Sequence, residues 1–153
     1  MIVRPAKVEE IDTLLAFEQG IVTAERPFDS TLREGEIHYY DLIHLIESPI
    51  AEVVVAEIDS ELVGSGYALI KEAKPYLKHT HYAYLGFMYV KPEYRGQGVN
   101  KAILDALKQW AISKNITEIR LEVYDENLVA KKAYEKAGFK GNLLEMRMEL
   151  TIE

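Results

Sequence analysis

The sequence contains no cysteine, which excludes disulfide bonds, thiolate metal ligands and a cysteine nucleophile. It has no apolar run near the ~20 residues that a membrane-spanning helix needs. Its first residues, MIVRPAKVEE, lack the basic start and apolar core of a signal peptide. We therefore expect a cytoplasmic protein that has no membrane partner.

Basic residues are the minority among the charged ones. There are 18 Lys and Arg against 25 Asp and Glu, and the formal net charge is −7. A general nucleic-acid binder needs a basic face, so we expect no nucleic-acid partner. The negative field favours a cationic substrate, and it still allows one small basic pocket for a polyanionic ligand.

Hydrophobic residues make up 48% of the 153, enough for one core, and no repeat or linker divides the chain. We expect a single domain over residues 1–153. The periodicity of apolar residues predicts strands at 2–4, 53–58, 62–70, 82–90, 119–123 and 144–152, and helices at 8–23, 36–48, 97–114 and 127–137. In the first helix the apolar Ile11, Leu14 and Leu15 are expected to face the core, and Glu18 shares their spacing. Asp59-Ser60 predicts the turn of a hairpin, and Gly64 and Gly66 indicate a bulge or a close backbone approach.

The stretch PEYRGQG, residues 92–98, lies between a strongly apolar strand and an amphipathic helix. The first amides of a helix have no partner inside it, and they carry the positive end of its dipole. Gly96 and Gly98 would let a ligand approach the backbone, and Arg95 would add a fixed positive charge. These features predict a pyrophosphate site, with an ordinary glycine-containing turn as the alternative.

Two other phosphate-binding motifs do not fit this loop. A P-loop requires Lys and then Ser or Thr after its last glycine, but Val99-Asn100 follow Gly98. A dinucleotide-binding fingerprint requires a third glycine, and Lys101 stands at that position.

The sequence resembles the GNAT superfamily of N-acetyltransferases in two segments. Val90-x-Pro92-x-Tyr94-Arg95-Gly96-x-Gly98-Val99 is similar to the family's acetyl-CoA loop, Gln/Arg-x-x-Gly-x-Gly/Ala. Arg95 and Gly98 match that pattern, and Asn100 departs from it, because Gly or Ala is usual there. The second segment is Asn127-x-x-Ala130-x-x-x-Tyr134-Glu135-x-x-Gly138-Phe139. The resemblance is specific over about residues 82–140 and loose over residues 1–60.

This resemblance implies an α/β, GNAT-like single domain. Its sheet would be mixed, mostly antiparallel and twisted, with about six to seven strands and helices on both faces. It also implies an N-acetyltransferase that moves an acetyl group from acetyl-CoA to a primary amine by direct attack in a ternary complex. The alternative is a non-catalytic acyl-CoA-binding regulatory module. A homodimer could form through an edge strand, for which the C-terminal strand is a candidate.

The implied cofactor-binding residues are Met88, Tyr89, Val90, Arg95, Gly96, Gln97, Gly98, Val99, Asn100, Lys101, Asn127, Ala130 and Tyr134. By resemblance, Tyr134 would act as the general acid that protonates the leaving thiolate. Many relatives place a general-base glutamate where this chain has Tyr84. Glu122, on the neighbouring strand, is the expected substitute. The alternatives are a solvated strand-end carboxylate at Glu122, with water as the relay, and a core tyrosine at position 134.

Other candidate residues lie outside these two segments. His79 and His81 would share one face of a strand, but two imidazoles without a third ligand predict no metal site. We expect an exposed hairpin end there. Arg4 and the Tyr39-Tyr40 pair are expected to lie on the acceptor side.

Overall fold

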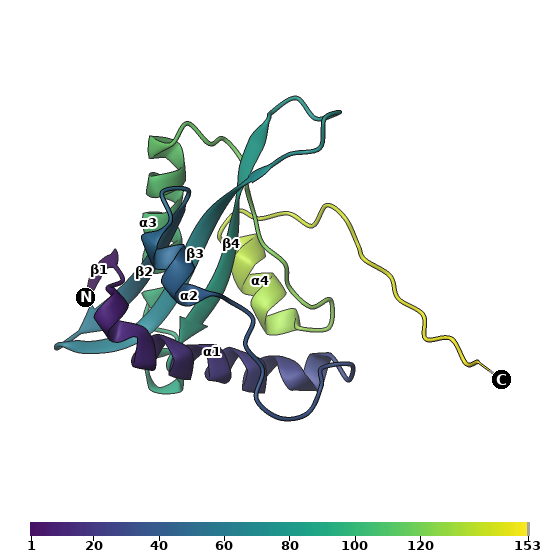
Figure 1. Cartoon of the computed structure of the whole chain (residues 1–153), viewed down its shortest axis with the longest axis horizontal. Coiled ribbons are helices and arrows are strands. Elements are labelled where there is room, and N and C mark those ends of the chain that lie inside the picture. Colours follow the sequence, from purple (N-terminus) through teal and green to yellow (C-terminus); the bar gives the residue numbers. More distant parts are fainter. Residues whose placement is uncertain (153) are drawn as a thin grey trace. The chain divides into compact units, whose positions relative to one another are not determined.

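The computed structural model describes residues 1–152, in two units that divide at Glu122 and Val123. The first unit is built on one sheet with the strand order β1-β2-β3-β4-β5 (Figure 1). Its strands are β1 (Ile2–Pro5), β2 (Ala51–Ile58), β3 (Glu61–Glu72), β4 (His81–Val90) and β5 (Ile119–Arg120). The first three pairings are antiparallel and the β4–β5 pairing is parallel. The α/β class and the mixed sheet are confirmed. The predicted number of six to seven strands was wrong, because the sheet has five strands among residues 1–152.

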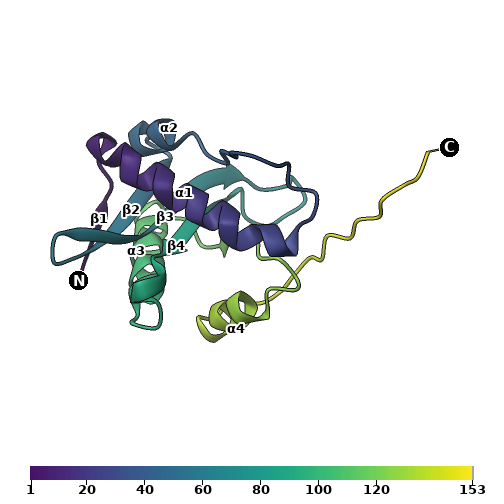
Figure 2. The ribbon, with the colours of Figure 1, turned by 90° about the horizontal axis from the view of Figure 1, so that it is seen from below.

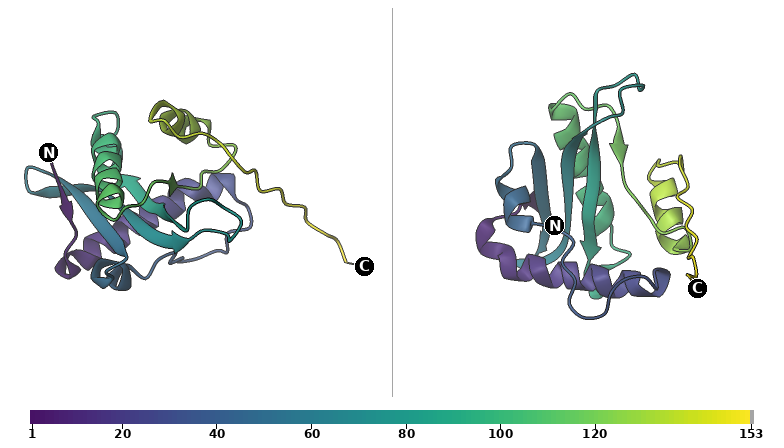
Figure 3. Two further views of the ribbon diagram at one scale, coloured as in Figure 1. Left: turned by 90° about the horizontal axis from the view of Figure 1, so that it is seen from above. Right: turned by 45° about the vertical axis from the view of Figure 1, so that its right-hand side comes forward.

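Helices cover both faces of this sheet. Helices α1 (Ile11–Glu25) and α2 (Leu42–Glu47) lie on one face and α3 (Val99–Ser113) lies on the other, as Figures 2 and 3 show. Short 3₁₀ turns at Val8–Glu10, Arg26–Phe28 and Pro92–Tyr94 connect these elements. In α3 the side chains of Val99, Ile103 and Leu107 are buried at helical spacing, which explains why this helix packs along one face.

Glycines in β3 allow α3 to pack closely on the sheet. A Cβ atom at Gly66 would lie 2.7 Å from the side chain of Ile103, and one at Gly64 would lie 3.0 Å from the side chains of Ile103 and Val99. Real side-chain carbons do not approach so closely, so any larger residue would force α3 away from the strand. The close backbone approach predicted for these two glycines is confirmed.

The second helix is shorter than predicted because Glu18 binds the backbone that would have begun it. Glu18, on α1, is fully buried and accepts the backbone amides of Tyr39 and Tyr40 at 2.8 and 3.0 Å. Amides that donate to a side chain in this way are not available for an α-helical ladder. The helix therefore starts only at Leu42, after the side chain of Asp41 caps it. The prediction that only the three apolar residues of the α1 pattern face the core was wrong, because Glu18 is buried as well.

The second unit, from Val123 onward, contains helix α4 (Leu128–Lys136). Asn127 caps its start: the side chain accepts the Ala130 amide at 3.2 Å. Gly138, with φ 107°, ends it, and the Phe139 amide returns to the Tyr134 carbonyl at 3.0 Å. This is a Schellman motif, so both ends of α4 are specified locally.

The strand predicted over residues 144–152 is not formed, and the chain runs extended from Phe139 (Figure 1). A strand is defined by its pairing as well as by its alternation, and no strand pairs with this segment among residues 1–152. Its alternate apolar side chains are exposed: Leu144, Met146, Met148, Leu150 and Ile152. Within the same residues, no helix combines the length and apolar character needed to cross a bilayer.

Replacing Glu18 by leucine tests its part in ordering this segment. The change leaves two partly buried amides without an acceptor, so we expect the free energy of unfolding to fall by roughly 2 to 6 kcal/mol, at ~1–3 kcal/mol for each unsatisfied group. Urea denaturation measures the loss. The control is Glu36→Gln, which alters an exposed carboxylate of the same segment. Glu36 lies 3.3 Å from His38, whose other ring nitrogen lies 2.8 Å from Glu18. Equal stability of the two variants would contradict the assigned role.

Candidate functional site

Strand β4 is interrupted by a β-bulge at Phe87. Tyr67 of β3 pairs with Gly86 and Ser65 pairs with Tyr89, so two β4 residues lie opposite one β3 residue. Phe87 has φ 57°, a left-handed conformation that a bulky residue rarely adopts. Such a conformation persists only where the surrounding structure holds it in place, and it is typical of functional sites.

Two side chains hold the bulge. Ser65, which is fully buried, donates its hydroxyl to the Phe87 carbonyl at 2.9 Å. Burial raises the pKa of the Tyr40 hydroxyl and the Phe87 main chain partly offsets this rise, and the two aromatic rings meet edge to face at 5.4 Å. These contacts replace ladder bonds that the bulge removes, so the distortion leaves fewer polar groups unsatisfied.

Beyond the first residues of β4, the sheet opens toward β5. The parallel register joins only Ala83 to Ile119 and Tyr84 to Arg120. In the part of the chain that the structure describes, no strand pairs with this edge of β4 from Leu85 to Val90. The predicted residues Met88, Tyr89 and Val90 lie on this open stretch, where main-chain groups can bind a ligand. The strand predicted at 119–123 is only two residues long, because only Ile119 and Arg120 pair with β4.

The loop after β4 has a left-handed backbone at both of its glycines. Gly96 and Gly98 have φ 78° and 83°, and a Cβ atom at either would meet nothing within 4 Å. Gly98 is the N-cap residue of α3, and no side chain caps that helix. Val99, Asn100 and Lys101 form its first turn. The open backbone and the uncapped amides fit an anionic group, as predicted for a pyrophosphate.

Side chains at the loop fix its position on the sheet. The Tyr94 hydroxyl donates to Glu61 at 2.7 Å, and the Lys91 ammonium lies 3.4 Å from the same carboxylate. The hydrogen bond from Tyr94 lowers the pKa of Glu61. Arg95 donates from Nε to the Val90 carbonyl at 3.2 Å, and Gln97 donates to the Glu93 carbonyl. The Arg95 guanidinium is therefore exposed beside the loop.

The two positions considered for the general base are joined by a hydrogen bond. The Tyr84 hydroxyl donates to the Glu122 carboxylate at 3.0 Å. Burial, and then the negative charge of Glu122, raise the pKa of Tyr84, so the phenol keeps its proton. Glu122 itself is exposed, and its carboxylate is thus in contact both with solvent and with a half-buried phenol.

The remaining predicted residues lie on α4 and its cap. Asn127 and Ala130 form the N-terminal cap, and Tyr134 packs its ring on Phe139 at 5.7 Å in an edge-to-face contact. Neither α4 nor its cap contains a fully buried residue. Tyr134 is therefore not a buried core residue within its own unit.

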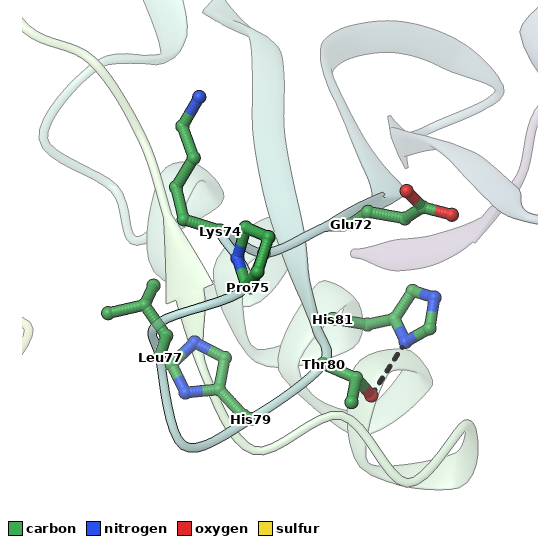
Figure 4. Close-up of a pocket in the computed structure, with 8 residues that line it drawn as sticks. Glu72, Lys74, Pro75, Leu77, His79, Thr80 and His81 are labelled. Carbon is green, nitrogen blue, oxygen red and sulfur yellow. Dashed lines mark hydrogen bonds between the residues drawn. The ribbon is translucent and has the colours of Figure 1, made fainter.

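The histidine pair lies at the end of the β3–β4 hairpin, as expected, with His81 exposed and His79 partly buried. His79 precedes β4 and lies 3.1 Å from Glu118, whereas His81 contacts Thr80 at 2.9 Å. Figure 4 shows the two rings on different sides of the hairpin, around a cavity of about 230 Å³. Among residues 1–152, no three His, Asp or Glu side chains gather as metal ligands would.

Arg4 does not join the tyrosines. It forms ion pairs with Glu10 at 2.7 Å and Glu57 at 3.5 Å at the β1 edge, and the hydrogen bond from Arg4 lowers the pKa of Glu10. A larger cavity of about 590 Å³ lies at the C-terminal end of α3 and includes Ile112 and Ile116. None of the predicted site residues lines it.

Sequence reasoning missed Ser65, Tyr67 and Gly20 as parts of this region. Ser65 and Tyr67 alternate with the two glycines of β3, a signal that these residues face away from α3. A Cβ atom at Gly20 would lie 2.5 Å from the Tyr89 ring, so this α1 glycine admits that side chain. A glycine inside an amphipathic helix is the available signal.

A glycine loop at an uncapped helix N-terminus can bind an anionic group such as a pyrophosphate. A sequence model of the acetyltransferase (GNAT) family matches residues 18–139. The chain belongs to this family. GNAT acetyltransferases use acetyl-CoA, and the matched residues include the loop, Glu122 and Tyr134.

Curated relatives match over a shorter stretch. The chain is 42% identical over 55 residues to the thialysine N-epsilon-acetyltransferase of Bos taurus, and to that of Sus scrofa. The match covers 36% of this chain and 32% of each relative. It thus spans about a third of the length of these relatives.

Solved structures match over nearly the whole chain. A tetramutant of the BH1408 protein from Bacillus halodurans has a TM-score of 0.85 at 20% identity, covering 98% of this chain and 100% of that one. A predicted acetyltransferase with acetyl-CoA from Clostridium acetobutylicum has a TM-score of 0.76 at 21% identity, covering 95% of each chain. The aminoglycoside 6'-N-acetyltransferase AAC(6')-IG from Acinetobacter haemolyticus has a TM-score of 0.74 at 16% identity, covering 100% of each chain. At these identities the likeness shows the fold.

Substitution of Gly98 by alanine tests the loop backbone. A left-handed alanine costs roughly 1–2 kcal/mol, so the loop should shift and acetyl-CoA should bind about tenfold more weakly. The matched control is Gly35→Ala, since Gly35 has φ 87° and equally open surroundings. Isothermal titration calorimetry should show weaker binding for Gly98→Ala only. Equal binding by both variants would contradict a role for this loop.

Proposed function

We propose that this chain is an acetyl-CoA-dependent N-acetyltransferase that acetylates a primary amine by direct attack in a ternary complex. One observation carries the proposal: the bulged β4 leads directly into a left-handed glycine loop at an uncapped helix N-terminus. Membership of the GNAT family supports it. No covalent enzyme intermediate is needed, and the chain has no cysteine to form a thioester.

The loop would hold the pyrophosphate of acetyl-CoA. Its backbone from Gly96 to Lys101 offers amide donors without side-chain obstruction, and Arg95 supplies a guanidinium beside them. Asn100 lies in the first helical turn, where its side chain would border the same group. The family pattern implies that Asn127 and Ala130 contact the pantetheine arm.

The open edge of β4 would orient the acetyl thioester, which acetyl-CoA supplies. Main-chain groups of Met88, Tyr89 and Val90 have no strand partner on that edge in residues 1–152, so they can hydrogen-bond an extended ligand. Donors held by a rigid strand stabilise the developing oxyanion without reorganisation. The hydrogen bond from Ser65 and the ring contact of Tyr40 with Phe87 would keep this strand rigid.

Proton transfer is the next requirement. An alkyl amine has a pKa of ~10.4 and arrives mostly charged at neutral pH. Glu122 is the proposed base, and it would take the proton directly or through water while Tyr84 donates to its other side. Tyr134 is the proposed acid that returns a proton to the leaving thiolate.

The rival function is a non-catalytic module that binds acyl-CoA and regulates a partner. The absence of a carboxylate at Tyr84 favours it. The relatives' names support the enzyme, because they specify acetyl transfer to thialysine and to aminoglycosides.

A Tyr134→Phe variant separates the two functions. Phenylalanine keeps the ring that packs on Phe139, so the fold and the Kd for acetyl-CoA should stay nearly unchanged. Loss of the hydroxyl should lower kcat about 100-fold or more if Tyr134 is the general acid. Thiol release with a panel of amines measures the effect, and Tyr76→Phe, at an exposed tyrosine, is the control. Undiminished turnover would reject Tyr134 as the acid, and wild-type binding without turnover on any amine would favour the regulatory module.

The two units are proposed to act as one acetyltransferase domain, residues 1–153, because the family match spans both. We also propose a homodimer in which the exposed segment 144–152 pairs with the same segment of a second copy. An antiparallel register centred on Met148 places Arg147 opposite the partner subunit's Glu149 and sets apolar residues opposite apolar ones.

Light scattering after size exclusion tests this pairing. The wild type should have twice the 17.5 kDa mass of the chain. A Met148→Lys variant should have the single mass, because a charge would enter the apolar face. The control is Thr151→Lys, on the opposite face of the same extended segment. A monomeric wild type would overturn the pairing.

A further inference from the structure

Three tyrosine side chains from separate parts of the first unit form a continuous aromatic cluster. Tyr40 meets Tyr67 edge to face at 5.5 Å between ring centroids, and Tyr67 meets Tyr84 at 6.4 Å. Tyr40 precedes α2, Tyr67 lies on β3 and Tyr84 lies on β4. We call these three residues the tyrosine cluster.

The tyrosine cluster adjoins the β4 bulge. Tyr40 contacts the Phe87 ring and its main chain. A Cβ atom at Gly86 would lie 2.6 Å from both Cζ and the hydroxyl oxygen of Tyr67, so the phenol end of Tyr67 lies directly over this glycine. The cluster therefore begins beside the strand that we propose orients the thioester.

Acidic side chains act on both ends of the cluster. Glu122 accepts a hydrogen bond from the Tyr84 hydroxyl at 3.0 Å. The pKa of Tyr67 is raised first by the burial of its own side chain and second by the negative charge of Glu122. At the other end, burial first and then Tyr67, Glu25 and Glu18 raise the pKa of Tyr40. The phenols are therefore neutral at physiological pH. Tyr67 is buried, whereas Tyr40 and Tyr84 are partly exposed, so these two side chains form the accessible part of the cluster.

The ring of Tyr84 already binds an ammonium group. Lys71 places its Nζ 4.4 Å from the centroid of that ring, in cation–π geometry. Lys71 is exposed, so its side chain can move into solvent when another cation approaches. The same aromatic surface rejects anions, because Glu122 would repel them.

From this arrangement we propose that the tyrosine cluster and Glu122 form the acceptor-binding surface, and that the acceptor is a small aliphatic diamine bound as a dication. The inference rests on the proposed acetyl transfer and names its substrate class. One ammonium would lie at the cluster near the bulge, where it would give its proton through water to Glu122 and attack. The second would remain charged against the ring face of Tyr84, and until that proton transfer the Glu122 carboxylate favours the dication.

Calorimetric titration of the CoA-saturated protein tests this surface without requiring turnover. The probes are a five-carbon diamine and the amino alcohol and amino carboxylate of the same chain length. We expect the diamine to bind about tenfold more tightly than the amino alcohol, with the amino carboxylate weakest, given a cation–π contact and a partly exposed ion pair. Glu122→Gln should remove most of this preference.

A second pair of variants isolates the aromatic ring. Tyr84→Leu should weaken diamine binding about fivefold, whereas Tyr84→Phe keeps the ring and should change it about twofold or less. Tyr76→Leu, at an exposed tyrosine outside the cluster, is the control for a general loss of aromatic residues. Equal losses in the two Tyr84 variants would overturn the role of the ring.

The outcomes for the surface and for the enzyme are separable. Equal binding of the three probes, or a diamine preference that survives Glu122→Gln, would overturn the inferred surface. If thiol release is fastest with the amino alcohol or the amino carboxylate, acetyl transfer stands and the inferred substrate class fails. If the diamine binds selectively but no amine releases thiol, the surface stands and the proposed enzyme function fails.

Discussion

Phe87 holds a left-handed backbone conformation in the middle of β4, and much of the candidate site depends on that one residue. The bulge inserts an extra residue opposite β3, and the β4–β5 ladder ends three residues before Phe87, after Tyr84. The distortion is stabilised by a buried hydroxyl from Ser65 and by contacts of Tyr40 with the ring and main chain of Phe87. A regular β4 paired along its length with β5 would leave no free main-chain edge for an extended ligand.

The contacts of Tyr40 connect this strand to the first helix. Glu18 of α1 accepts the amides of Tyr39 and Tyr40, and Tyr40 in turn packs on Phe87. A buried carboxylate is costly unless hydrogen bonds satisfy it. The amides of Tyr39 and Tyr40 satisfy Glu18, and in doing so they fix the backbone that carries the Tyr40 ring. The ordering of residues 37–40 is thus a tertiary effect of α1, not a local helical preference.

Much of the fold could be predicted from the sequence because local signals specify it. The pattern of apolar residues predicted all five strands that form in residues 1–152, with β5 shorter than expected, and Asn127 and Gly138 are local signals for the two ends of α4. The glycine loop was predicted at its place before α3, and its left-handed backbone is a finding of the structure. These features depend on residues close in sequence, where periodicity and capping chemistry are informative.

The rest depends on partners that lie far apart in the chain. The second helix is short because Glu18 binds residues 21 and 22 positions later, and periodicity cannot show that. The bond between Tyr84 and Glu122 spans 38 residues, so the sequence indicated both positions without joining them. The alternation over residues 144–152 predicted a strand, but pairing requires a second strand that alternation does not supply.

The loop and the tyrosine cluster differ in what they are made of. The loop offers mainly backbone amides, whose chemistry is the same for nearly every residue type, and it needs glycine at Gly96 and Gly98 for conformation. The cluster offers ring faces and hydroxyls, which a single codon change can remove or exchange. Under the proposed function, point substitutions on the cluster would alter the preferred amine, while the loop backbone proposed to bind acetyl-CoA would be inherited unchanged.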